Sequence, residues 1–365
     1  MSALESLQDD WLGEDERDLL DALGELFDEI AGSALPAGGQ AAGDKAALRL
    51  DSLREQGWYE FATDEGTSTL LYAEAVKRLH RRLPPVQAPI FEALAALRVL
   101  SAATDPAAEE LLSAAQSGER GIVLDFASLF APRAPGSAGG AVPFGDTFTA
   151  LVVVDDGSDL ALHVVEPSGA DAESTALVDP TLPSFRTRGT GERVSAIPRE
   201  KWEVAAAETL VVQANALVGQ SQALLDSTLQ FLTVREQFGV PISSFQALRH
   251  RAADVASDLY AAQQLSIHIA ETFDDGADRW QLGLLGKSLC GRAAVKASSE
   301  AVQLRGGMGF TWEDGTHFGL KRIMGLALTG PSVEDAEREL GSAVIETGRP
   351  RWAGGLNNAQ GVVEQ

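Results

Sequence analysis

Hydrophobic and polar residues follow different periods in three successive parts of the chain. Up to about residue 118, apolar residues recur every three or four positions, as in DERDLLDALGELFDEIAG, where acidic residues fill the opposite face. From about 119 to 198 the apolar runs are short and rich in β-branched residues, and from about 200 to 345 the helical period returns. We predict an α+β chain with an N-terminal helical domain (1–118), a small middle β domain (119–198), a C-terminal helical bundle (199–345) and a flexible tail (346–365).

The middle region contains three candidate strands. The runs GIVLDFAS, FTALVVVDD and LALHVVEP are each bounded by turn residues. The link DDGSD between the last two predicts a β-hairpin. Gly-, Pro- and Ser-rich connections such as APRAPGSAGGAVPFGD surround them and indicate long loops.

One long helix of the C-terminal region carries a narrow apolar seam. Leu210, Leu217, Leu224 and Phe231 are spaced every seven residues, with small residues between them. Such a seam is typical of a helix that packs within a bundle.

Composition limits the classes of function. The chain has 365 residues, with 29 basic and 53 acidic residues, and its net charge of -24 argues against nucleic acid or an anionic membrane surface as a partner. The single cysteine, Cys290, lies in an apolar stretch and is expected to be a buried small hydrophobe. The first residues contain no apolar segment, and no run is long enough to span a bilayer, so we expect no signal peptide and a cytoplasmic location.

The stretch REQFGVPISSFQALRH joins two predicted helices and contains polar groups that a turn does not require. Pro241 is expected to stop the first helix and Ser243 or Ser244 to cap the second. A planar guanidinium at Arg235 suits a pyrophosphate, although a surface salt bridge would also explain it. The aromatic side chain of Phe238 could cover a ring.

In the same stretch, the amide of Gln246, at the start of the second helix, could form hydrogen bonds with polar atoms at the edge of a ring.

A second stretch, QLRGGMGFTWEDGTH, ends another predicted helix with glycines. Gly306 and Gly307 would allow the backbone to lie against a ligand, and Gln303 stands one turn before them as a hydrogen-bond donor. A simple helix C-cap is the structural alternative.

The same stretch presents a candidate base. Glu313 follows closely on Phe310 and Trp312. Apolar neighbours would disfavour its ionised form, which raises the pKa of a carboxyl and makes it a better base near neutral pH. A solvated loop glutamate is the alternative.

Together, REQFGVPISSFQALRHRAADV and AVQLRGGMGFTWEDGTHFGLKR resemble the acyl-CoA dehydrogenase family. The first is similar to that family's R-x-Q-F-G-x-P-I-x-x-F-Q-x-x-x-H-x-x-A-D, and the second to its A-V-Q-x-x-G-G-x-G-[FY]-x-x-E. The order of helices, small β region and helices also matches, so the resemblance covers roughly residues 5–345. It implies an N-terminal helical domain, a small middle β domain and a C-terminal four-helix bundle, assembled as tetramers.

The resemblance also implies FAD as cofactor and α,β-dehydrogenation of an acyl-CoA thioester as reaction. Glu313 matches the position of the catalytic base in many members. The residues that would contact FAD, mostly in a site shared with a neighbouring subunit, are Arg235, Phe238, Gln246, Gln303, Gly306 and Gly307. An electron-transfer flavoprotein accepts the electrons in most relatives.

The sequence departs from the family pattern at the start of the long C-terminal helix. Leu210 stands where many members carry an arginine near the substrate, and Thr209 where a minority place their catalytic glutamate. Glu208 is rotated from that position by about 100° of helix, so it should point elsewhere.

The β region departs further, because the flavin-holding T-E-x-x-x-G-S-D and W-I-[TS]-N stretches of the family are missing. The sequence WEDGTHFGLKR is similar to W-E-H-D-x-H-x-x-x-[KR]-R, a variant found in members that act on sterol-like, bulky CoA esters. Those members often form α2β2 heterotetramers of two unlike chains.

Three functions follow as hypotheses. The first is one chain of a heteromeric or homotetrameric FAD-dependent dehydrogenase for a bulky acyl group in lipid or steroid catabolism. The second is a catalytically degenerate partner that completes the flavin site of another chain. The third is a flavin oxidase, or a dehydrogenase of a carrier-protein thioester, on the same fold. His317 is expected to hydrogen-bond at a helix start and His250 to pack in the bundle; no metal site is expected.

Overall fold

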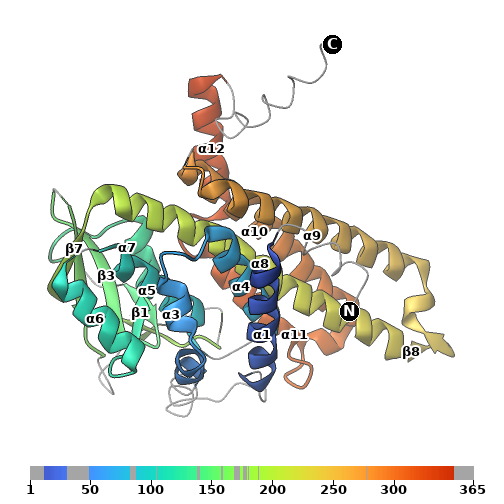
Figure 1. Ribbon diagram of the computed structural model, residues 1–365. Coiled ribbons are helices and arrows are strands. Elements are labelled where there is room, and N and C mark those ends of the chain that lie inside the picture. Colours follow the sequence, from blue (N-terminus) through green and yellow to red (C-terminus); the bar gives the residue numbers. More distant parts are fainter. Residues whose placement is uncertain are drawn as a thin grey trace.

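The computed structural model describes residues 12–30, 49–82, 88–103, 105–137, 140–157, 159–167, 173–175, 179, 181–187, 189–276 and 278–348. The predictions for the first residues and for the tail after Pro350 lie outside them. Helices come first, then short strands, then long helices (Figure 1). The N-terminal helices are α1 (Glu14–Ile30), a segment at 49–55, α3 (Trp58–Thr63), α4 (Thr69–Arg82), α5 (Ile90–Ala102) and α6 (Pro106–Ser117).

The middle region forms two small sheets. One has the strand order β1-β3-β4-β7 and the other β2-β6-β5, and all pairs are antiparallel except β1 with β3. The elements are β1 (Ile122–Leu124), α7 (Phe126–Phe130), β2 (Ala141–Pro143), β3 (Thr149–Asp155), β4 (Leu160–Val165), β5 (Glu173–Thr175), β6 (Ser184–Arg186) and β7 (Glu192–Ile197).

The hairpin predicted from DDGSD is confirmed. Asp155 pairs with Leu160 across β3 and β4, and Gly157 in the link has a φ of 113°, which an L side chain rarely adopts. All of β3 except Asp155 is buried, and helix α7 packs against this strand.

The C-terminal region is a bundle of long helices. In Figure 1, α8, α9 and α10 run side by side, the β8–β9 hairpin lies at the end of α8 farthest from the middle sheets, and α12 projects from the bundle. The elements are α8 (Arg199–Val234), β8 (Glu236–Gln237), β9 (Val240–Pro241), η2 (Ile242–Ser244), α9 (Gln246–Phe273), α10 (Arg279–Arg305), η3 (Gly306–Phe310), α11 (Thr316–Leu328) and α12 (Val333–Thr347).

Two local predictions for the turn after α8 were wrong. Pro241 does not stop the helix, because α8 already ends at Val234 and Pro241 lies in the short hairpin that follows. The cap of α9 is not a serine either. Its N-cap residue is Phe245, and the Ser244 hydroxyl donates to the Pro241 carbonyl, so the 3-10 turn uses the hydroxyl that the helix would have needed.

The predicted seam of α8 is the centre of the bundle. Leu210 and Leu217 are fully buried, and Leu224 is buried. The hydroxyl of Ser221, between the last two, donates to the carbonyl of Leu217 and so costs no unpaired polar group. Cys290 on α10 is also fully buried, as expected, and burial raises the pKa of its thiol to about 12.

Helix α4 touches the backbone of α8 at a glycine. A Cβ atom added to Gly219 would lie 2.1 Å from the carbonyl oxygen of Lys77, so no larger residue fits without moving one helix. This contact fixes the distance between the N-terminal helices and the bundle.

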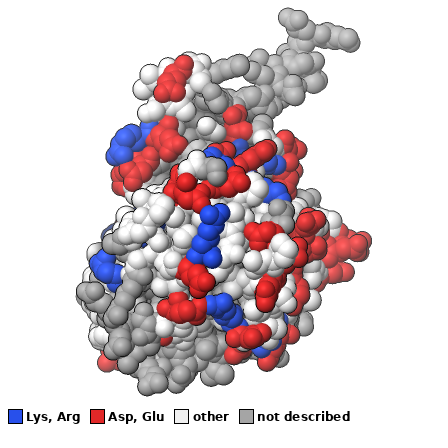
Figure 2. All heavy atoms as spheres, turned by 90° about the vertical axis from the view of Figure 1, so that its left-hand side faces the viewer, with Lys and Arg blue, Asp and Glu red and all other residues white. Residues whose placement is uncertain are grey.

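The charged residues on the surface reflect the acidic composition of the chain. The face shown in Figure 2 carries clusters of acidic side chains with basic side chains set among them. Within the described residues, no helix is both long and apolar enough to cross a membrane.

Candidate functional site

A large cavity lies where the three regions meet. Its volume is about 680 Å³, and its walls come from α4, α5, the strands β2 and β6, α8 and the whole length of α11. Most of the lining is apolar, with Phe91, Leu224, Phe318 and Ile323 among the large side chains. A cavity of this size, apolar with a few polar groups, is typical of a small-molecule or cofactor site.

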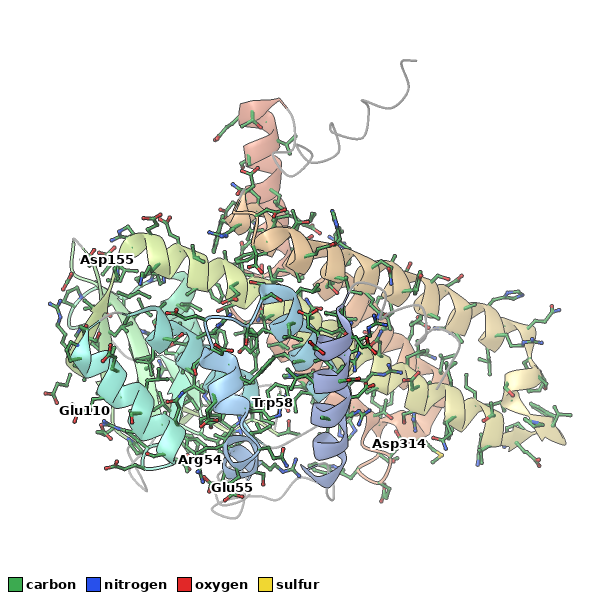
Figure 3. All side chains as sticks on the ribbon, viewed as in Figure 1. Arg54, Glu55, Trp58, Glu110, Asp155 and Asp314 are labelled. Atoms are coloured by element: carbon green, nitrogen blue, oxygen red, sulfur yellow. The ribbon has the colours of Figure 1, made fainter. Side chains whose placement is uncertain are left out.

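Glu313 lies at one end of this cavity, in the loop before α11. The next residue, Asp314 (labelled in Figure 3), fixes this loop to the end of α10 through an ion pair with Arg305, with 2.6 Å between Oδ2 and Nη1. Both side chains are buried, at 8% and 5% exposed. The other carboxylate oxygen of Asp314 accepts hydrogen bonds from the backbone N–H and the hydroxyl of Thr316, which start α11. The position of Glu313 therefore depends on Asp314.

The aromatic neighbours of Glu313 do not cover it in the single chain. Phe310 is 69% exposed and Trp312 is 63% exposed, and the Glu313 side chain is itself exposed. Trp312 packs edge-on against Phe318 with ring centroids 5.0 Å apart. The apolar surroundings expected for Glu313 would thus have to come from a ligand or a second chain.

Polar groups also line the deeper part of the cavity. On α11, the Nε of Arg322 donates to Asp179 at 2.5 Å and its Nη2 donates to the Thr181 hydroxyl at 2.7 Å. These bonds join α11 to the segment before β6. Glu92 and His80 line the same part, and burial lowers the pKa of His80 to about 4 and raises the pKa of Glu92.

Three predicted cofactor residues lie outside the cavity, at the β8–β9 end of the bundle (Figure 1). Arg235 and Gln246 are exposed, and Phe238 is 93% exposed with a φ of 56°. Among the described residues, no carboxylate pairs with Arg235. The surface salt bridge that was the alternative for this arginine is not formed.

The other three predicted cofactor residues lie at the end of α10. Gln303, Gly306 and Gly307 are all exposed, and a Cβ added to either glycine would have no heavy atom within 4 Å. Gly306 has a φ of 61°, which favours glycine. The backbone here is open to a ligand or a second chain.

The residues present fit the ring and the phosphates of a flavin dinucleotide at two separate places. The cavity has the size and mostly apolar lining that a ring system needs, but Arg322, the one arginine among the described residues that line it, is already bound to Asp179. A pyrophosphate needs a cation without such a partner, and Arg235 at the tip of the bundle is one. Within one chain, the apolar cavity and this arginine are therefore at separate places.

Thr209 on α8, the alternative position for a base, does not line the cavity. Its neighbour Glu208 does not line it either. Glu208 accepts hydrogen bonds from Arg98 at 2.8 Å and from the Thr69 hydroxyl at 3.1 Å, so it holds α4 and α5 against α8. Leu210 is fully buried among apolar side chains.

The two notable histidines differ from expectation. His317 is buried in the first turn of α11, but its Nδ1 has no hydrogen-bond partner among the described residues. Burial lowers its pKa. His250 is exposed on α9 rather than packed in the bundle. In the described part of the chain, no group of histidine, cysteine and carboxylate side chains could hold a metal ion.

Comparison with known proteins finds a family model that matches the C-terminal region. Residues 207–330 match the family model described as acyl-CoA dehydrogenase, C-terminal domain. This region of the chain is therefore similar to the C-terminal domain of acyl-CoA dehydrogenases. Two relatives from Mycobacterium tuberculosis are acyl-CoA dehydrogenase FadE34, 32% identical over 60% of this chain, and acyl-CoA dehydrogenase IpdE2, 34% identical over 36% of this chain. The matched segments span only 31% and 39% of those relatives.

Solved structures show that the fold extends over nearly the whole chain. The ChsE4–ChsE5 complex from M. tuberculosis matches with a TM-score of 0.75 and 18% identity, over 92% of this chain and 99% of that one. A glutaryl-CoA dehydrogenase from Mycobacterium smegmatis in complex with FADH2 matches with a TM-score of 0.71 and 16% identity, over 94% and 97%. The expected acyl-CoA dehydrogenase fold is confirmed.

Proposed function

We propose that this chain takes part in the FAD-dependent α,β-dehydrogenation of a bulky, sterol-like acyl-CoA thioester, as one chain of a heteromeric assembly. The observation that carries this proposal is the position of Glu313 at one end of a 680 Å³ cavity formed by all three regions of the fold. The volume and mostly apolar lining of that cavity support a bulky acyl group, and the likeness to the ChsE4–ChsE5 complex supports a heteromeric assembly.

Glu313 would act as the base. Its carboxylate takes the α-proton of the acyl group, which the thioester carbonyl makes acidic, and the electron pair of that C–H bond forms the new double bond. A bound flavin would supply the other half of the chemistry by accepting the β-hydrogen as hydride at N5. Arg305 and Asp314 hold the loop so that Glu313 faces the cavity.

A partner chain would complete the site. Arg235, Phe238 and Gln246 at the β8–β9 end would contact the phosphate and adenosine half of FAD, and Gln303 with the open backbone of Gly306 would contact it from α10. All are exposed in this chain, which supports a binding partner for them. An electron-transfer flavoprotein would reoxidise the flavin.

The base is tested by flavin reduction. Assemblies carrying Glu313→Gln should be reduced by a sterol side-chain CoA ester about two to four orders of magnitude more slowly than wild type, as measured by anaerobic stopped-flow absorbance. Glu346→Gln, a change on the far helix α12, is the matched control. Equal rates for wild type and Glu313→Gln would exclude this glutamate as the base.

The second candidate is the degenerate partner that completes another chain's flavin site. It is favoured by the exposure of Glu313 and of its aromatic neighbours Phe310 and Trp312. The visible spectrum after gel filtration separates the two candidates. Flavin bound to this chain alone supports the dehydrogenase, whereas colour that appears only on co-expression with a second dehydrogenase-like chain, together with an unaffected Glu313→Gln, supports the partner role.

A further inference from the structure

A carboxylate lies in the cavity wall on an otherwise almost entirely apolar helix. Glu92 is in the first turn of α5, whose sequence is IFEALAALRVLSA and whose residues from Ile90 to Leu97 are all buried. The Glu92 residue is only 7% exposed and lines the cavity. No side chain of the described residues forms a hydrogen bond or an ion pair with its carboxyl group.

Burial of such a group is costly. Taking an ionised carboxylate out of water without a partner costs on the order of several kcal/mol. Burial accordingly raises the pKa of Glu92, and the nearby charge of Arg322 offsets only part of that effect. Packing alone does not explain Glu92, since a leucine would fill the wall without this cost.

The surrounding charges decide which ligand group fits beside Glu92. An anionic group would be repelled by Glu92 and by Asp179, and a cationic group would meet the guanidinium of Arg322. A neutral group that donates a hydrogen bond suffers neither repulsion. Among neutral donors that an acyl group can carry, a hydroxyl is the simplest.

The distance from the proposed base can be counted along α11. Arg322 lies six residues after Thr316, the first residue of α11, which corresponds to about 9 Å of helix rise. Glu313 precedes that helix, so the polar part of the cavity lies well beyond the position where the thioester would react. Phe318 and Gly319 line the cavity between Thr316 and Arg322.

We propose that Glu92 is a specificity-determining residue that accepts a hydrogen bond from a hydroxyl on the distal part of the acyl group. The preferred substrates would then be hydroxylated acyl-CoA esters. This inference rests on the proposed acyl-CoA function, and it adds a hydrogen-bond acceptor to a mostly apolar acyl site.

Decanoyl-CoA and its ω-hydroxy derivative provide a matched pair of probes. Their dissociation constants are measured by calorimetry on the purified assembly that contains the full chain. Wild type should bind the hydroxy ester about tenfold more tightly, which is the size expected for one hydrogen bond to a carboxylate. Glu92→Leu should abolish this preference, whereas Met324→Leu, a change elsewhere in the same cavity wall, should keep it.

A second readout needs no ligand. Because the buried carboxyl of Glu92 has no side-chain partner among the described residues, Glu92→Leu should raise the midpoint of thermal unfolding, while a structural role would lower it. Equal affinities of wild type for the two esters, a preference that survives Glu92→Leu, or a lowered midpoint would each overturn the inference. Flavin loss in Glu92→Gln with an unchanged preference would also overturn it and would assign Glu92 to the flavin ring instead. If wild type binds neither ester, the proposed function itself fails.

Discussion

A buried lysine holds the C-terminal end of α11. Lys287 on α10 is fully buried, and its Nζ donates to the carbonyl oxygens of Leu326 at 2.9 Å and Thr329 at 2.8 Å. Gln213 donates to the same two oxygens. No carboxylate pairs with Lys287 in the described part of the chain, and burial lowers its pKa to about 7. Both carbonyls belong to residues that line the cavity.

This lysine should make stability depend on pH. Its pKa is about 7 in the folded chain and near 10.5 when unfolded, so between these values the unfolded chain binds more protons. The free energy of unfolding should therefore rise as pH increases from about 7 to 10. We expect a gain of about 1–2 kcal/mol, less than burial alone would give, because two carbonyls favour the ammonium form.

Chemical denaturation at pH 7 and at pH 10 measures this difference. Lys287→Met should remove the rise, and Lys201→Met, a change at an exposed lysine near the start of α8, should keep it. A rise of the same size in Lys287→Met would mean that other groups cause it.

At the scale of elements, the loop between α10 and α11 is organised by one ion pair. Arg305 ends α10 and binds Asp314, and it also contacts Ser227 and Thr228 on α8. The loop thus joins three helices through a single guanidinium. Its glycines and aromatic residues, by contrast, are largely exposed.

Asp314→Asn should destabilise the chain by about 3 kcal/mol, since it leaves a buried guanidinium without its counter-charge. Urea unfolding followed by circular dichroism measures the loss. Asp335→Asn on α12 is the control, because its pair with Arg338 is exposed to solvent and should contribute little. Equal effects of the two changes would contradict the role assigned to Asp314.

The helices and strands themselves were predicted from the sequence more accurately than the residues at which they begin and end. The strands β3 and β4, the hairpin between them and the seam of α8 were predicted because each depends on a local period. Pro241 and Ser244 were misjudged because a short hairpin and a 3-10 turn separate the helices, and neither has a strong local signal. Glu92 was missed, although a lone carboxylate within the apolar run PIFEALAAL was a visible signal of a buried polar site.

On the scale of the whole molecule, Arg235, Phe238 and Gln246 lie at the β8–β9 end of the bundle, outside the cavity of their own chain. Arg235→Ala should therefore leave the fold of this chain unchanged but weaken flavin retention in the assembly by about tenfold, the effect of losing a charge-assisted contact to phosphate. Flavin absorbance of the co-purified assembly, measured after dilution, tests this expectation.

Arg338→Ala is the control for Arg235→Ala, because it removes an exposed arginine on α12 instead. Full flavin content in both variants would argue against a phosphate contact at Arg235. A loss of the assembly itself would show up separately in gel filtration.

The backbone contact at Gly219 has a mechanical consequence for the cavity. Helices α4 and α8 cannot approach or slide without a clash between Gly219 and the carbonyl of Lys77, so the wall that they form is rigid. The opposite wall, α11, is held by polar contacts along its length, through Arg305 before its start, Arg322 at its middle and Lys287 at its C-terminal end. Adjustment of the cavity to ligands of different width must therefore occur by displacement of α11, and these contacts resist that movement.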